Sequence, residues 1–189
     1  MSMLEMADAL ARPFEPHEVT WKAQAVSKDG QQALAVPYLN ARACMDRLDE
    51  VFGFDGWKDA YHVLPDGCVV CRLSVRVDGG WVSKTDVGEP GQDHADFAKK
   101  AAFSDALKRA AVKLGIGRYL YRLPKQWVAW DSQRKTFKTQ PRLPTNALPP
   151  SQPAPALPAN STSRRRNDYV ATGPVGKTEP VRVPEEIPF

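Results

Sequence analysis

The sequence predicts an α+β fold in which an antiparallel sheet is covered by helices on one face. Residues Trp57 to Val87 alternate between apolar and polar side chains, as strands with one buried face do. The next segment, Ala95 to Leu114, repeats its apolar residues every three or four positions, as an amphipathic helix does. Turns rich in aspartate and glycine separate the alternating runs, which is typical of consecutive hairpin strands. Strands followed by a long covering helix predict the α+β class.

The amino-terminal part of the chain predicts a short arm and then a hairpin. Leu4 to Ala11 has the spacing of a short helix that ends before Pro13, and we expect it to pack on this domain or on a neighbouring subunit. Val19 to Val26 and Ala33 to Leu39 are strand-like runs on either side of an Asp-Gly turn, which favours a hairpin. Lys28 lies at its tip and is expected to be exposed.

A second helix is predicted from Asn40 to Phe52, with Asn40 as its amino-terminal cap. The residues spaced for its buried stripe are Ala41, Met45, Leu48 and Phe52. Arg42 and Arg47 are expected on the outside of this helix.

Three strands follow and predict an antiparallel meander, namely Trp57 to Leu64, Cys68 to Val77 and Trp81 to Val87. In the middle strand the apolar set consists of Val69, Cys71, Leu73, Val75 and Val77. Because neighbouring side chains on a strand point to opposite faces, this set predicts the core face. Arg72 and Arg76 then face water or a phosphate.

The long helix is predicted to be apolar on one side and basic on another. Its apolar stripe consists of Phe103, Leu107, Ala110, Ala111 and Leu114, and Gly115 is expected to end the helix. The basic side carries Lys99, Lys108, Arg109 and Lys113, and the only carboxylates within the helix are those of Asp96 and Asp105. Such a side is often simply a solvated surface, but the scarcity of acids favours an anionic partner.

After this helix, Tyr119 to Tyr121 and Gln126 to Trp130 read as short extended pieces, with Lys135 to Lys138 returning. The aromatic residues lie beside Arg118, Arg122 and Lys125. They either stack on nucleic-acid bases or belong to the core and to subunit contacts.

From Pro141 the composition changes to proline, alanine, serine and threonine, which predicts a disordered tail. We therefore expect an arm at 1–18, a folded domain at 19–140, a linker at 141–183 and a tip at 184–189. A cationic spot at Arg164 to Arg166 interrupts the linker and predicts a weak phosphate tether or a solubilising run.

Composition limits the classes of function. The chain has 189 residues and a net charge of +4, which permits nucleic-acid binding without proving it. Three cysteines and the lack of an apolar leader favour a reducing cytosol, so we expect a cytoplasmic, nucleoid-associated protein without a membrane span. Gly173 to Thr178 is too short for a phosphate loop, and Cys68 and Cys71 lack a second pair for a metal. No cofactor, metal or catalytic residue is predicted.

Two blocks resemble the Rad fifty-two-type family of single-strand annealing proteins, and most closely its bacterial DdrA-like end-protection branch. The first block is KKAAFSDALKRAAVKLGIGRYLYRLPKQW, residues 99–127, and the second runs from Val36 to Trp57. The resemblance covers about Thr20 to Pro144. It implies that Lys108 and Arg109 match the paired cations of the family's inner DNA groove, and that Lys28 falls where another groove cation lies. It also implies a ring-forming homo-oligomer.

The expected function is ATP-independent binding of single-stranded DNA in recombination and repair, with annealing of complementary strands or protection of single-strand ends. The predicted DNA-binding residues are Lys28, Lys99, Lys100, Lys108, Arg109, Lys113 and Arg118. One alternative is a metal-dependent nuclease that uses Asp86, Glu89 and Lys99, and another is an adaptor that acts mainly through its tail.

The adaptor alternative depends on the final residues, Glu185, Glu186, Ile187, Pro188 and Phe189. They resemble the acidic, hydrophobic tip of bacterial single-strand DNA-binding proteins (SSB), which recruits repair and replication enzymes. An aromatic ring beside acidic groups fits a pocket that is apolar inside and basic at its rim. A third possibility is that this tip occupies the protein's own basic groove and is displaced by DNA.

Overall fold

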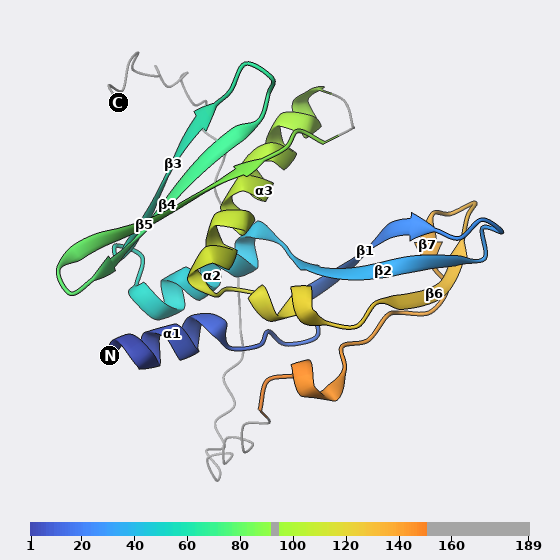
Figure 1. Cartoon of the computed structure of the whole chain (residues 1–189), viewed down its shortest axis with the longest axis horizontal. Helices are drawn as coiled ribbons and strands as arrows, with labels where there is room; N and C mark the ends of the chain where they lie inside the picture. The colour runs from blue at the N-terminus through green and yellow to red at the C-terminus, as the bar shows by residue number, and fades with distance from the viewer. Residues whose placement is uncertain (92–94, 151–189) are drawn as a thin grey trace, which may run out of the picture. The chain divides into compact units, whose positions relative to one another are not determined.

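The computed structural model describes residues 1–91 and 95–150 (Figure 1). Three helices and two antiparallel sheets make up the described part, so the predicted α+β class is confirmed. The helices are α1 (Met3–Ala11), α2 (Ala41–Phe52) and α3 (Ala95–Leu114). The strands are β1 (Val19–Val26), β2 (Gln32–Leu39), β3 (Trp57–Val63), β4 (Val69–Val77), β5 (Gly80–Gly88), β6 (Gln126–Asp131) and β7 (Thr136–Phe137).

The predicted meander is the sheet β3-β4-β5, and α3 covers one of its faces (Figure 1). The alternate β4 residues Val69, Cys71, Leu73 and Val75 are buried against this helix. Gly88, at the end of β5, lies so close to α3 that a Cβ atom there would fall 2.2 Å from the Ala102 carbonyl oxygen. Alanines on the helix and a glycine on the strand therefore permit close contact of the two backbones.

The second sheet has the order β1-β2-β6-β7. The β1–β2 hairpin was predicted, but its partner was not: β2 pairs antiparallel with β6, with Leu34 opposite Trp127. Ser132 Oγ donates a hydrogen bond of 2.8 Å to the carbonyl of Gly30 and so ties the hairpin turn to the β6–β7 connection. The exposed Lys28 lies at this turn, at the end of the hairpin that points away from α3 (Figure 1).

The amino-terminal arm packs on its own domain. Leu10 and Phe14 are buried in the same core cluster as Leu48 and Ile116. Asn40 caps α2 as predicted, since its side chain accepts a hydrogen bond of 2.8 Å from the Ala43 amide.

Arg47 was expected on the outside of α2, and this prediction is wrong. Its side chain is only 4% exposed. The Nη1 atom donates to the carbonyls of Ala9 (3.0 Å) and Arg12 (2.8 Å), and the guanidinium lies 4.1 Å from the Phe14 ring centroid. The arm covers this face of α2, and its carbonyls satisfy the buried cation.

The apolar stripe of α3 is also partly corrected. Phe103 was expected in the core, but it is 36% exposed at the edge, where its ring lies 5.0 Å from that of Tyr61. The buried side of the helix consists largely of small residues, namely Ala98, Ala102, Ala106, Leu107, Ala110 and Ala111. A close helix–sheet contact leaves no room for a large ring at its centre.

The segment after α3 differs from the prediction as well. Gly115 and Gly117 end the helix with positive φ angles of 115° and 66°. Arg118–Arg122, whose two tyrosines were expected in an extended piece, forms a 3₁₀ turn instead and buries Leu120. The predicted strand Gln126 to Trp130 and its return are confirmed as β6 and β7.

Disorder was predicted from Pro141, whereas residues 141–150 follow a defined path along the fold. Gln126 Nε2 donates a hydrogen bond of 3.0 Å to the carbonyl of Arg142, and Ala147 is buried in a short 3₁₀ turn. The predicted cationic spot at Arg164 to Arg166 and the tip from Glu185 to Phe189 lie outside the described residues.

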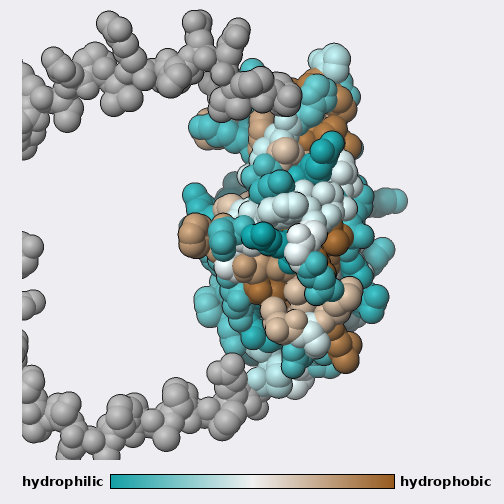
Figure 2. Space-filling model, turned by 90° about the vertical axis from the view of Figure 1, so that its left-hand side faces the viewer, coloured by the Kyte–Doolittle hydropathy of each residue, from teal (hydrophilic) through white to brown (hydrophobic). Residues whose placement is uncertain are grey.

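The surface on the side of the meander and α1 is mainly hydrophilic, with separate hydrophobic spots (Figure 2). Exposed apolar residues of these elements include Met3, Leu4, Val63 and Trp81. None of the helices within 1–91 and 95–150 is long and apolar enough to cross a membrane.

Candidate nucleic-acid interface

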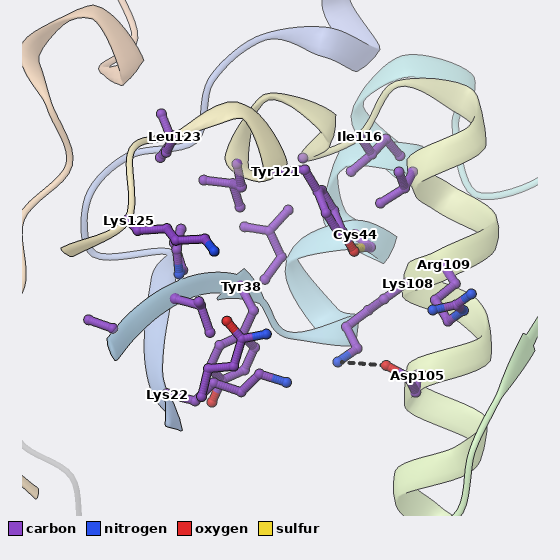
Figure 3. Close-up of a pocket in the computed structure, with 18 of the residues that line it drawn as sticks. Lys22, Tyr38, Cys44, Asp105, Lys108, Arg109, Ile116, Tyr121, Leu123 and Lys125 are labelled. Atoms are coloured by element: carbon purple, nitrogen blue, oxygen red, sulfur yellow. Dashed lines mark ion pairs between the residues drawn. The ribbon is translucent and has the colours of Figure 1, made fainter. Parts of the chain in front are cut away.

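A groove of about 370 Å³ lies between β1 and β2 on one side and α3 with the 3₁₀ turn on the other (Figure 3). Its apolar lining includes Leu39, Cys44, Val112, Ile116 and Leu120. Its charged lining consists of Lys22, Lys108, Arg109, Lys125 and Asp105. We call this the basic groove, because four cations and one carboxylate line it.

Tyr38 brings two of these cations together. Lys108 extends from α3 toward the Tyr38 ring, and Lys22 lies beside the same ring (Figure 3). The two ammonium nitrogens are 5.6 Å and 5.9 Å from the ring centroid, within the range of a cation–π contact. Asp105, one turn before Lys108, forms a loose ion pair of 3.6 Å with it. The ring thus helps to hold two like charges close together without a carboxylate for each.

Arg109 and Lys113 meet a carboxylate that the helix sequence does not contain. Asp86 on β5 accepts from Arg109 Nε at 3.2 Å and from Lys113 Nζ at 3.0 Å, and Lys113 also donates to the carbonyl of Thr85. This corrects the expectation that only Asp96 and Asp105 accompany the basic side of the helix. Asp86 neutralises only part of this positive charge, because its one negative charge is shared by two cations.

The same contacts set the ionisation of Asp86. Burial tends to raise the pKa of this carboxyl, but hydrogen bonds from the Val87 amide, Lys113 and Arg109 outweigh it and hold the pKa below its usual value. Asp86 therefore carries its full negative charge at neutral pH. Even with this charge included, the cations of the basic groove outnumber its acids.

The other predicted DNA-binding residues lie elsewhere. Lys28 is at the hairpin turn, while Lys99 and Lys100 are exposed on the first half of α3, and none of these three lines the basic groove. Arg118 is exposed, but its Nε donates to the carbonyl of Val112 at 2.9 Å and its Nη2 to that of Lys113 at 2.8 Å. Arg118 thus satisfies the last carbonyls of α3.

Sequence reasoning missed Lys22, Tyr38 and Lys125 as groove residues. Lys22 and Lys125 are more than a hundred residues apart in the chain, and both line the groove because β2 pairs with β1 on one side and with β6 on the other. The sequence feature that could have indicated Lys22 is the polar face of β1, which carries Lys22 and Gln24.

The two tyrosines of the 3₁₀ turn have different roles. Tyr119 is half-buried, its hydroxyl accepts a hydrogen bond of 3.1 Å from the Phe14 amide, and burial raises its pKa. Tyr121 lines the basic groove and is 74% exposed. Of the two alternatives for these aromatics, Tyr119 fits the core and Tyr121 remains available for stacking.

The groups considered for the nuclease alternative do not converge. Both carboxylate oxygens of Asp86 are engaged by cations, and Glu89 is exposed beyond the end of β5. Within the described residues, no three His, Cys, Asp or Glu side chains are grouped as a metal site requires. Burial raises the pKa of Cys44, at the groove, to about 11, so this thiol is protonated at neutral pH.

The chain is similar to proteins of DNA repair. Residues 3–139, which include the whole basic groove, match the model of the Rad52/22 family double-strand break repair protein. Two relatives are each called single-stranded DNA-binding protein DdrA, from Deinococcus deserti and Deinococcus radiodurans. Each is 40% identical over 155 residues, which cover 82% of this chain and 76% and 73% of those proteins respectively.

A third relative, the DNA repair and recombination protein radC of Emericella nidulans, is 32% identical over 135 residues, or 60% of this chain and 23% of that protein. The family match spans both sheets and all three helices. On this evidence, the chain belongs to the Rad52/22 family of double-strand break repair proteins.

Proposed function

We propose that the protein binds single-stranded DNA along the basic groove, without ATP and without cleaving it, and acts in recombination and repair. The observation that carries the proposal is the convergence of Lys22, Lys108, Arg109 and Lys125 on one groove with a single lining carboxylate. The name of the two DdrA relatives, single-stranded DNA-binding protein, supports the same ligand.

The chemistry of the groove favours contacts to the backbone of the strand. Ammonium and guanidinium groups neutralise phosphates and release counterions, so affinity falls steeply as salt rises. Contacts to phosphates carry no base information, and a strand held by its phosphates keeps its bases available for pairing. This arrangement suits a protein that anneals complementary strands or protects single-strand ends.

We further propose that the protein forms a ring-shaped homo-oligomer in which the grooves of successive subunits follow one another. Lys28, Lys99 and Lys100 then contribute charge to the DNA path outside the groove of their own subunit. A determination of the assembly mass, combined with a strand-annealing assay on the same preparation, tests both the oligomer and the annealing activity. A monomer that anneals no faster than protein-free strands would contradict them.

Tyr121 is expected to stack on a base at the mouth of the groove. Its ring is largely exposed and lines the same groove as Lys125 and Arg109. Loss of the ring should cost about 1 kcal/mol, the lower end of the range for base stacking and about fivefold in affinity. Tyr121→Ala should therefore weaken binding of an unstructured oligonucleotide, and Tyr121→Phe, which keeps the ring, should not. Equal affinities for the two variants would assign Tyr121 no stacking role.

The segment from Glu185 to Phe189 is proposed as a docking tip for repair or replication proteins. Deleting it should abolish capture of such partners while DNA binding stays intact, because the proposed groove lies in another part of the chain. Replacing Glu185 and Glu186 by glutamine separates the contribution of the acidic residues to partner binding from that of the hydrophobic residues. If the protein without these residues still captures its partners, the proposed role of the tip is wrong.

A further inference from the structure

We propose that Asp86 lowers the affinity of the protein for DNA by competing with phosphates for Arg109, which lines the basic groove, and for Lys113, one turn further along α3. The inference rests on the proposed function, since it concerns the strength of the same binding. Its basis is one carboxylate whose two oxygens each bind a cation of α3, at 3.2 Å and 3.0 Å.

The geometry makes Asp86 a substitute for a phosphate. A carboxylate offers anionic oxygens to guanidinium and ammonium donors in the way that a phosphodiester does. Asp86 comes from β5, where it lies opposite Cys71 on the face that α3 covers, and its side chain is only 17% exposed. The acid is therefore fixed to the sheet, and the two cations reach it from the helix.

The cations themselves remain accessible. The side chains of Arg109 and Lys113 are 52% and 47% exposed. Asp86 engages Arg109 through Nε, and within the described residues the two Nη atoms of this guanidinium have no hydrogen-bond partner. A strand can therefore approach both side chains while the carboxylate still holds them.

The consequence is weaker binding of the strand. A phosphate that reaches Arg109 and Lys113 either displaces Asp86 or shares these cations with it, and in both cases binding is less favourable. The two cations are about half exposed, and ion pairs near the surface contribute about 1 kcal/mol each, so the effect moderates binding and does not prevent it. Moderate affinity is useful for annealing, because the protein must release the strand once it has paired.

The test is Asp86→Asn in the full-length protein, titrated with a fluorescent oligothymidylate that has no structure of its own. We expect binding about three- to tenfold tighter at physiological salt. The plot of log affinity against log salt should steepen by up to roughly 0.7, the value for one more neutralised phosphate on a single strand.

Asp78→Asn is the matched control. It removes the same charge from the exposed β4–β5 turn, two residues before β5 begins and eight residues before Asp86 in the chain. Asp78 has a positive φ of 49°, a conformation that asparagine tolerates well, so this variant should fold and bind as the wild type does. A second variant, Asp86→Ser, removes the carboxylate with a smaller side chain and repeats the test if the asparagine variant does not fold.

The outcomes separate the inference from the function on which it rests. A folded Asp86 variant with unchanged or weaker affinity, or a control that tightens binding equally, overturns the role of Asp86. Tighter binding that persists when Arg109 and Lys113 are already alanine also overturns it, because no cation is then left to release. Wild-type protein that does not bind the oligonucleotide at all would instead refute the proposed function.

Discussion

Changing Lys108 and Arg109 together to alanine is expected to weaken binding of single-stranded DNA about tenfold to a hundredfold. These residues supply two of the four cations that line the basic groove, and Lys108 is the one that extends toward Tyr38 (Figure 3). Loss of two phosphate contacts should also flatten the salt dependence, with a change in slope of roughly 1.4. A fluorescence titration of an unstructured oligonucleotide at several salt concentrations measures both quantities.

The domain should remain folded in this double variant. Lys108 pairs with Asp105 at 3.6 Å and Arg109 with Asp86 at 3.2 Å. Each pair has one partly exposed partner, and ion pairs near the surface contribute about 0 to 1 kcal/mol each to the free energy of unfolding. Lys99→Ala with Lys100→Ala is the comparison, since it removes two cations from the same helix outside the groove and should weaken binding less. Unchanged affinity of the Lys108 and Arg109 variant at physiological salt would contradict the assignment of the groove.

Arg47→Ala is expected to lower the free energy of unfolding by about 3 kcal/mol, because it leaves two partly buried carbonyls without a donor and empties the space of a buried side chain. The carbonyls of Ala9 and Arg12 both accept from Arg47 Nη1. The guanidinium also lies 4.1 Å from the Phe14 ring centroid and pairs with Glu50 at 3.1 Å. One side chain therefore joins the arm to α2, and its removal affects every one of these contacts.

Thermal and chemical unfolding measure this effect. For a domain of this size, a loss of about 3 kcal/mol lowers the melting temperature by roughly 6 to 12 °C. Arg42→Ala is the control, because Arg42 is exposed on the same helix and its loss should change the stability by less than about 0.5 kcal/mol. Equal melting temperatures for the two variants would show that the arm does not depend on Arg47.

The sequence predicts those features of the fold that depend on local periodicity. The two-residue alternation of β4 specifies a strand and its buried face, and both are confirmed. The three- and four-residue spacing in α3 specifies the helix, but it predicts the buried side only in part, because Phe103 lies at the exposed edge. Lys108 could be singled out for the same reason, since its position on the flank of α3 follows from helical spacing. Lys22, which contacts the same Tyr38 ring, could not be singled out, because no periodicity relates α3 to β1.

Arg47 and Asp86 show which information the sequence lacks. A single arginine on an amphipathic helix reads as solvated, and its burial depends on where the arm from Met3 to Phe14 lies. Asp86 occupies an inward position of β5, but its contact with Arg109 depends on the angle at which α3 crosses the sheet. Both are contacts between elements far apart in the chain, and local patterns do not encode them.

The central claim is that the groove holds the backbone of a single strand and leaves its bases free. Dimethyl sulfate modifies the pairing edges of adenine and cytosine in exposed single strands, so it tests this claim on an oligonucleotide saturated with the protein. We predict that these edges react as fast in the complex as in the free strand, and that modification of the phosphates by ethylnitrosourea is suppressed. Protected pairing edges with freely reactive phosphates would contradict the account.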